Sequence, residues 1–327
     1  MGTETVYCLD ALTGQTLWTR SYQGRFQGRV RTGDTHEYGG PSATPAFDLE
    51  TGFLYTLGID GDLRCWDTNR LGEPAWAINL YESYDVPQRP RTGRQRTDYG
   101  YTSTPHIYQD RIIVEVGAIQ GTVIAFDKRT GVLRWSSEHK EPAGHSGSCV
   151  RLKMNGLDCI GVLTLYSFLV MRTDKGHAGR TVTTTPWQTD FGCNIPTPAV
   201  IENRILITTG YNQKRMSLFE VSADGLGEEW TMREYASVSS PVVYRDRVFL
   251  LHHALKCIDL ATGDVKWRGG GFGHGTCLVT AGDQKLVVFG NQQLALIDPL
   301  AGDFRMLSQI DNVFRASAIR MSHWLMG

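Results

Sequence analysis

The sequence predicts an all-β fold, a β-propeller of four-stranded antiparallel blades, and two repeated signals carry this prediction. The first is a frame of Asp, two residues, Thr-Gly, three residues and Trp. The second is a short Ser/Thr-rich run that leads into apolar alternation ahead of each frame. Anchors of the second signal recur roughly every 40 to 50 residues, the period of a propeller blade; they are Pro45, Pro105, Cys149, Pro198, Pro241, Cys277 and Ala318.

The first signal predicts a tight hairpin followed by a docking side chain. Its Asp can accept hydrogen bonds from backbone N–H groups of the turn, and its Gly can adopt a positive φ. Its Trp ends the outermost strand, where we expect the ring to wedge against the neighbouring blade. The complete copies are Asp10, Gly14 and Trp18; Asp127, Gly131 and Trp135; and Asp259, Gly263 and Trp267.

One repeat shows how a single blade is built. Residues 104–135 read "TPHIYQDRIIVEVGAIQGTVIAFDKRTGVLRW", in which β-branched runs are separated by "YQDR", "GAIQG" and "DKRTG". Short strands between such turn signals predict a four-stranded antiparallel meander.

Applied to the whole chain, the repeat predicts a single domain over residues 1–327. Two half-blades stand at the ends, at 6–18 and 314–327. They either join, closing a seven-bladed ring without a free sheet edge, or belong to separate blades of an incomplete eight-bladed ring. Six whole units lie between them, at 39–80, 100–137, 143–187, 192–230, 235–267 and 273–307.

The Asp-x-x-Thr-Gly-x-x-x-Trp frame resembles the tryptophan docking motif of the quinoprotein (pyrroloquinoline quinone-like) β-propeller repeat family, from residue 6 to about residue 318. That family includes exported quinone-binding-like repeat proteins and the propeller lipoprotein of the outer-membrane β-barrel assembly machine. The resemblance implies eight blades in a full-length member and a periplasmic or cell-surface location. Residues 1–5 are no signal peptide, so we expect a fragment or an internally initiated chain.

Within this family the fold alone does not choose between an enzyme and a scaffold. The resemblance to the dehydrogenase branch implies a vicinal Cys pair, a Trp beneath the quinone and an acidic and amide set for calcium. The sequence has no adjacent Cys pair, and Glu115, Glu220, Asn194 and Asn291 all fit ordinary strand or loop positions. We therefore predict no catalytic residues and no cofactor, and keep a pyrroloquinoline quinone- or other cofactor-dependent oxidoreductase as the alternative.

Other residues that could carry chemistry have structural interpretations. The seven Cys include no Cys-x-x-Cys, and five occupy repeat-equivalent positions that favour buried, apolar roles. The run "GGGFGHG" at 269–275 is interpreted as a crossing between blades, because no helix follows it. His252 and His253 are neighbours on a predicted strand, so we expect opposite faces and no shared metal.

Charge and hydropathy exclude some partners. A net charge of −1 and a pI near 6.8 argue against nucleic acid and a membrane surface as general partners. The longest apolar stretch, residues 159–171, is too short to span a bilayer.

Two long crossings, after Trp18 and after Trp76, suggest a binding surface. Successive crossings of this kind emerge on one face of a propeller, and long loops on a rigid scaffold often bind partners. Arg and Tyr together suit an acidic protein segment or another anionic polymer. The alternative is solvated loops paired to nearby carboxylates such as Asp85. The predicted partner-binding residues of this non-catalytic scaffold are Arg25, Arg29, Arg31, Arg89, Arg91, Arg94, Arg96, Tyr84 and Tyr99.

Overall fold

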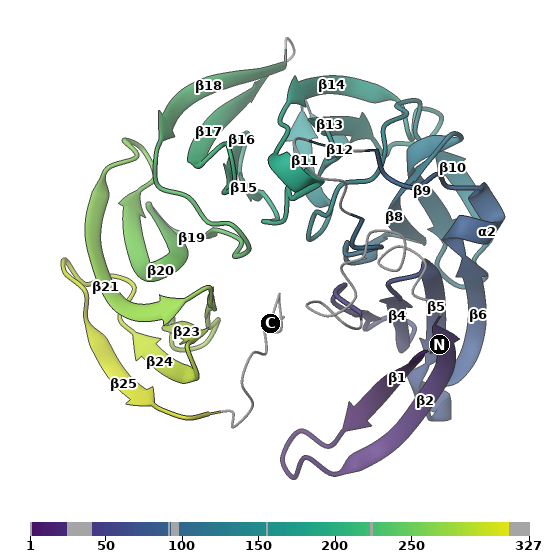
Figure 1. Ribbon diagram of the computed structural model, residues 1–327, viewed down its shortest axis with the longest axis horizontal. Coiled ribbons are helices and arrows are strands. Elements are labelled where there is room, and N and C mark those ends of the chain that lie inside the picture. The colour runs from purple at the N-terminus through teal and green to yellow at the C-terminus, as the bar shows by residue number, and fades with distance from the viewer. Residues whose placement is uncertain are drawn as a thin grey trace. The chain divides into compact units, whose positions relative to one another are not determined.

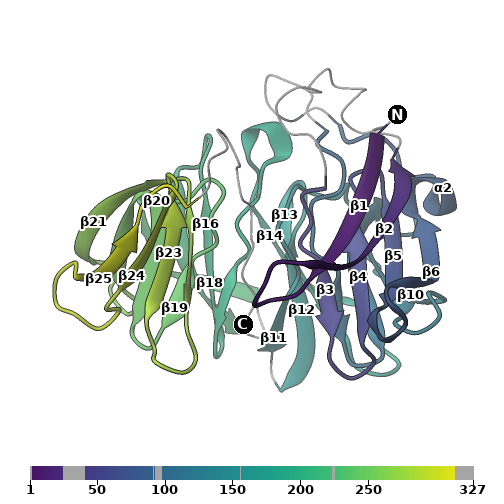
Figure 2. The same ribbon diagram turned by 90° about the horizontal axis from the view of Figure 1, so that it is seen from below.

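The computed structural model describes residues 2–24, 41–90, 92, 98–154, 156–222 and 225–313. Antiparallel strands make up nearly all of the regular structure in these ranges (Figure 1, Figure 2). The chain divides into two compact units, one of Met1–Cys149 with Cys159–Asn194 and the other of Val150–Asp158 with Ile195–Gly327.

In the first unit each strand pairs with the strand next to it in sequence, which is the meander that the repeats predict. The sheet orders are β1-β2, β3-β4-β5-β6 and β10-β9-β8-β7, and β12, β13 and β14 follow one another in the same way. The strands are β1 (Gly2–Leu9), β2 (Thr16–Gly24), β3 (Ala46–Asp48), β4 (Phe53–Leu57), β5 (Asp62–Asp67), β6 (Glu73–Asn79), β7 (His106–Tyr108), β8 (Arg111–Ala118), β9 (Gly121–Asp127), β10 (Leu133–Ser136), β12 (Leu157–Leu163), β13 (Ser167–Arg172) and β14 (Thr181–Pro186).

The second unit repeats this pattern in the orders β15-β16-β17-β18, β19-β20-β21 and β22-β23-β24-β25. With the first unit, the described residues form seven sheets, a number that fits seven blades. The strands are β11 (Val150–Met154), β15 (Ala199–Ile201), β16 (Arg204–Thr209), β17 (Arg215–Ser222), β18 (Gly225–Met232), β19 (Val242–Tyr244), β20 (Arg247–Asp259), β21 (Val265–Gly273), β22 (Thr276–Val279), β23 (Leu286–Gly290), β24 (Gln293–Ile297) and β25 (Met306–Ile310).

The turn of the repeated frame has the hydrogen bonds that its residues make available. Asp127 Oδ1 accepts from the backbone N–H groups of Arg129 and Thr130 and from the Thr130 hydroxyl, at 2.8 to 2.9 Å. Gly131 follows at φ 71°, where a side chain would be strained. The turns at Asp10 and Asp259 use the same acceptor oxygen.

The docking Trp of one repeat contacts the Asp-Thr-Gly turn of a later repeat in the chain. Trp76 Nε1 donates to the Lys128 carbonyl at 3.1 Å, and a Cβ on Gly131 would lie 2.9 Å from the Trp76 ring. In the second unit Trp230 Nε1 donates to the Leu260 carbonyl at 3.1 Å. The Trp76 ring therefore packs where only a glycine leaves room, so the glycine of the turn and the docking Trp depend on each other.

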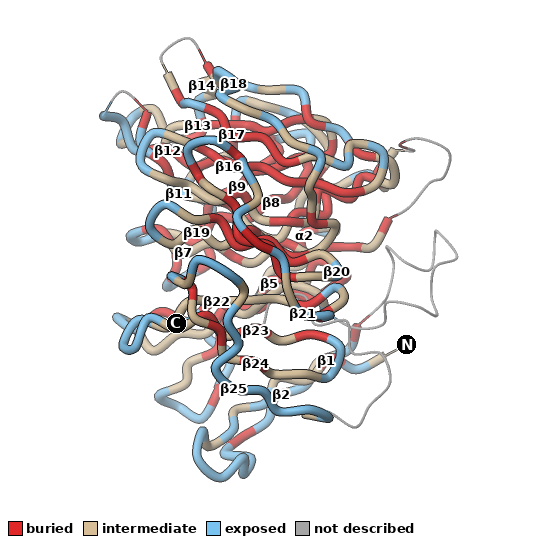
Figure 3. The backbone as a smooth tube through the Cα atoms, turned by 90° about the vertical axis from the view of Figure 1, so that its left-hand side faces the viewer, coloured by how far each residue is buried: buried red, intermediate tan, exposed pale blue. Residues whose placement is uncertain are grey.

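The core lies on the middle strands of each sheet, and the turns and outermost strands are exposed (Figure 3). All residues of β9 are buried, whereas those of β25 are exposed. All seven Cys are free thiols, and of the five repeat-equivalent ones Cys65, Cys149 and Cys257 are buried. Burial raises the pKa of Cys65 to about 12, which matches a packing role.

Two segments differ from the sequence-based expectation. The crossing after Trp76 contains a short helix, α2 (Leu80–Tyr84), capped by Asn79, whose side chain accepts from the Glu82 N–H at 3.1 Å. Residues 269–273 of the glycine run belong to strand β21 instead of a crossing. The expected half-blade at 314–327 lies outside the described residues.

Candidate functional site

The second long crossing is fastened to the first unit by a buried ion pair. Arg89 Nη1 lies 2.6 Å from Asp98 Oδ1, and the two side chains are 5% and 2% exposed. The same guanidinium donates from Nε to the Ala143 carbonyl at 2.6 Å and from Nη2 to the Gly144 carbonyl at 3.2 Å. The Arg89 guanidinium thus connects the crossing to residues 143 and 144, which are distant in sequence.

Asp98 is held as an anion by this geometry. Burial is the largest influence and acts to raise the pKa of Asp98, but the Arg89 guanidinium, His145 and two backbone N–H donors together outweigh burial and keep that pKa below its ordinary value. The carboxylate also accepts from the Gly100 N–H at 3.0 Å. Arg89 and Asp98, which flank residues 90–97 in the sequence, are therefore joined in one charge-compensated pair.

Tyr99 and Tyr84 extend this anchoring on either side. The backbone N–H of Tyr99 donates to His145 Nε2 at 3.1 Å, and the two rings meet edge to face with centroids 4.9 Å apart. Tyr84, at the end of α2, packs edge-on against Phe126 with ring centroids 6.1 Å apart. Both tyrosines are half-buried, so each keeps part of its ring accessible.

The predicted partner-binding residues consequently fall into three groups. Tyr84 and Tyr99 are accessible in part. Arg89 is buried, and its Nε, Nη1 and Nη2 nitrogens donate to two carbonyls and a carboxylate inside the unit, so its guanidinium does not lie on an exposed patch. The remaining arginines lie outside the described residues; they are Arg25, Arg29, Arg31, Arg91, Arg94 and Arg96.

Glu115 is one of the residues considered from sequence as calcium ligands, and its carboxylate is buried. It accepts hydrogen bonds from the Ser103 and Ser146 hydroxyls and from the Gly144 N–H, at 2.8 to 2.9 Å. Burial raises its pKa, and these donors oppose the rise in part. Calcium requires six to eight oxygen ligands, whereas the groups around Glu115 donate hydrogen bonds to its carboxylate. The surroundings of Glu115 therefore do not fit a calcium site.

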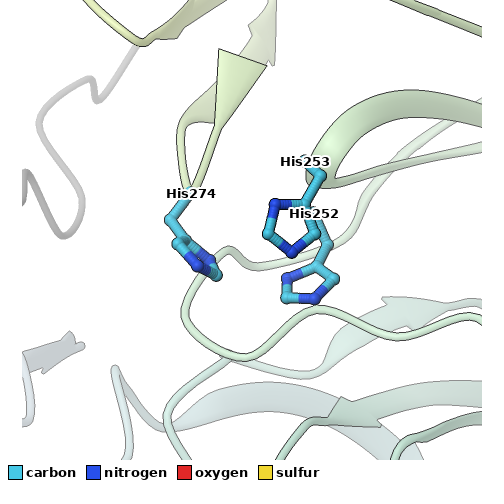
Figure 4. Close-up of side chains that lie close together, drawn as sticks. All are labelled: His252, His253 and His274. Atoms are coloured by element: carbon cyan, nitrogen blue, oxygen red, sulfur yellow. The ribbon is translucent and has the colours of Figure 1, made fainter. Parts of the chain in front are cut away.

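Three histidines of the second unit come together against expectation. His252 and His253 are sequence neighbours on β20, yet their ring centroids are 4.4 Å apart. The prediction that they point to opposite faces is wrong, because His253 adopts φ 63° and the ladder slips between His253 and Leu255. A β-bulge of this kind breaks the two-residue alternation. His274 joins them from beyond β21, as Figure 4 shows.

Local sequence gave partial signals for these features. Asn79 and Glu82 form a helix N-cap pattern, which predicts α2. His274 follows a glycine-rich run, and nothing local relates it to residue 252. The partners of Arg89 lie 54 and 55 residues further along the chain, so its burial follows from the fold and not from its neighbours.

The antiparallel meanders joined through Trp and turn define a protein of the β-propeller class, and solved structures support this fold. BamB from Moraxella catarrhalis matches with a TM-score of 0.61 and 12% identity, over 94% of this chain and 82% of that one. The computationally designed protein Ika8 matches with a TM-score of 0.60 and 14% identity, over 94% and 81%. The β-propeller predicted from the repeats is confirmed.

The chain belongs to the family described as outer membrane protein assembly factor BamB, whose family model matches residues 2–269. This confirms the resemblance inferred from the docking frame. The comparison with curated proteins gave no match. Among the described residues, none of the helices has the length and apolar character needed to cross a membrane.

Proposed function

We propose that this protein is a non-catalytic binding scaffold of the periplasm or cell surface. Its partner is a protein that presents an acidic segment to the long crossings of the first unit. The family supports the scaffold role, because it is described as an assembly factor. Location rests on the same family relationship.

One observation carries the choice of surface: the Arg89–Asp98 pair closes the segment that holds Arg91, Arg94 and Arg96. A loop whose ends are fixed loses less conformational entropy on binding than a free segment of equal length. Arginine pairs bidentately with carboxylates. The half-buried rings of Tyr84 and Tyr99 add apolar contact at the loop base.

Charge reversal tests this surface. We would titrate a fluorescently labelled oligoglutamate peptide into the wild type and into a variant with Arg29, Arg31, Arg94 and Arg96 changed to Glu. Wild-type binding should weaken with salt, because exposed charges are screened. The variant should lose binding by more than about tenfold, since each lost ionic contact is worth up to about 1 kcal/mol.

A charge-matched control separates location from net charge. The control variant changes four exposed lysines elsewhere to Glu: Lys140, Lys153, Lys175 and Lys214. The proposal requires this variant to bind like the wild type. Equal loss in both variants would mean that only net charge matters, and retention in both would refute the surface. Heparin in place of the peptide shows whether another polyanion is preferred.

A further inference from the structure

The histidine cluster of the second unit consists of His252, His253 and His274. One ring nitrogen from each residue lies within 4.8 Å of those from the other two. The ring centroids are 4.4, 5.0 and 5.1 Å apart, so the three rings form a nearly equilateral triangle. Among the residues that the structure describes, this is the group with metal-ligating geometry.

The backbone brings the three histidines together. In the ladder between β20 and β21, His253 pairs with Gly273, which places the next residue, His274, beside it. The bulge at His253 turns its ring toward that of His252. Figure 4 shows His252 and His253 on one stretch of chain and His274 on another, with the three rings gathered at one place.

The end of β21 is held in position by contacts on both sides. Phe272 is fully buried in the apolar core of the second unit. The Asn291 side chain donates to the Gly271 carbonyl at 2.6 Å. A Cβ on Gly273, which has φ 60°, would lie 2.5 Å from Asn291 Oδ1. The strand end that carries His274 is therefore fixed, and no bulkier residue fits at Gly273.

One nitrogen of the cluster is open to a ligand. His252 Nδ1 is buried and has no hydrogen-bond partner, and an unpaired buried polar atom is unfavourable. A coordinated metal ion would give this nitrogen a partner.

The surroundings allow an ion to enter. His253 and His274 are exposed, whereas His252 is half-buried against the Tyr235 ring, with centroids 4.5 Å apart. The nearby Lys256 ammonium pairs with Glu234 at 3.0 Å and donates to the His252 backbone carbonyl at 3.2 Å. The Glu234 carboxylate thereby offsets the positive charge of Lys256.

We propose that His252, His253 and His274 bind one divalent transition-metal ion, with the imidazole nitrogens as ligands and a solvent-facing position left open. Three imidazoles without a carboxylate favour zinc, copper, nickel or cobalt over calcium or magnesium. Zinc–nitrogen bonds of about 2.0 to 2.1 Å in a tetrahedral site place the nitrogens about 3.3 Å apart. The exposed rings of His253 and His274 reach this separation by small side-chain rotations.

The test is competition titration of the full, tag-free chain with zinc chloride against a chromophoric chelator. The wild type should bind one tight equivalent. His274→Ala and His253→Asn should each weaken that affinity by at least about tenfold, because even outer-shell changes cost 10- to 100-fold. Asn is chosen at position 253 because it tolerates a positive φ. His177→Ala, at a half-buried histidine of the first unit that lies beside Asp174, is the matched control and should bind like the wild type.

Cobalt(II) provides a second readout that does not depend on affinity. The wild type should develop the visible absorption of a four-coordinate ion at one equivalent, and the His274→Ala variant should not. Weak uptake of several equivalents, or uptake that is unchanged in both cluster variants, would overturn the proposal as adventitious surface binding. Circular dichroism of each variant shows whether the fold is retained, and His253→Gly provides a further substitution at the bulge if Asn disturbs it.

Discussion

The Arg89–Asp98 pair gives the sharpest test of how the first unit is held together. Replacing Arg89 with Met removes the cation but leaves the Asp98 carboxylate buried, with only backbone N–H donors such as that of Gly100 at 3.0 Å. It also leaves the Ala143 and Gly144 carbonyls without the donors at 2.6 and 3.2 Å. Two lost hydrogen bonds at about 1 kcal/mol each and an unpaired buried charge give a total of about 3 to 5 kcal/mol.

A matched control isolates burial as the cause. Arg70 and Glu73 are also 2.6 Å apart, but their side chains are 69% and 51% exposed. Arg70→Met should therefore lower the free energy of unfolding by no more than about 1 kcal/mol. Both free energies would be measured by urea denaturation, followed by tryptophan fluorescence and circular dichroism. Equal costs for the two variants would refute the assignment of the energy to a buried pair.

The pH dependence follows from the sign of the Asp98 shift. In the wild type the folded pKa of Asp98 is depressed, so the stability it contributes is present above the unfolded pKa and is lost as pH falls through the folded pKa. Without the Arg89 guanidinium, the largest influence that opposes burial is lost, so the folded pKa of Asp98 rises and protonation at low pH relieves the penalty. The difference between Arg89→Met and wild type should shrink from pH 7 toward pH 4, and the double variant with Asp98→Asn should recover part of the loss at pH 7.

Further predictions concern the docking frame and the cysteines. Trp76→Ala should cost about 3 kcal/mol in the free energy of unfolding, measured by urea denaturation, because its ring and its indole hydrogen bond are both lost. Gly14→Ala and Gly131→Ala share a positive φ near 70°, so each should cost about 1 to 2 kcal/mol. Gly131→Ala should cost roughly 1 to 3 kcal/mol more, since its Cβ would lie 2.9 Å from the Trp76 ring whereas that of residue 14 meets nothing; equal melting shifts would contradict this. Iodoacetamide followed by peptide mass spectrometry should label the partly exposed Cys8 well before the buried Cys65, and the reverse order would contradict the packing.

The turn of each repeat was predictable because its chemistry is local. Asp127, Thr130 and Gly131 supply the acceptor, the donors and the positive φ within five residues. The same locality made the order of strands predictable, since each strand pairs with its neighbour in sequence. A repeat with only local pairings leaves few alternative topologies.

The two site features were not predictable because each depends on distant backbone. Arg89 resembles a solvated loop residue until the carbonyls of residues 143 and 144 are placed beside it. The meeting of His252 with His253 depends on a bulge, and that of His274 on the register between β20 and β21. Strand alternation without a bulge predicts that the His252 and His253 side chains lie on opposite faces of the sheet.

Site-specific photo-cross-linking tests the central claim most directly, namely that an acidic partner segment binds at the loop closed by Arg89 and Asp98. A photoreactive amino acid would replace Gln95, between Arg94 and Arg96, and in a control protein it would replace the exposed Lys214 of the second unit. The account predicts adducts with the labelled oligoglutamate peptide from position 95, suppressed by salt, and few from position 214. Equal yields from both positions, or none from position 95 under conditions where the peptide binds, would contradict it.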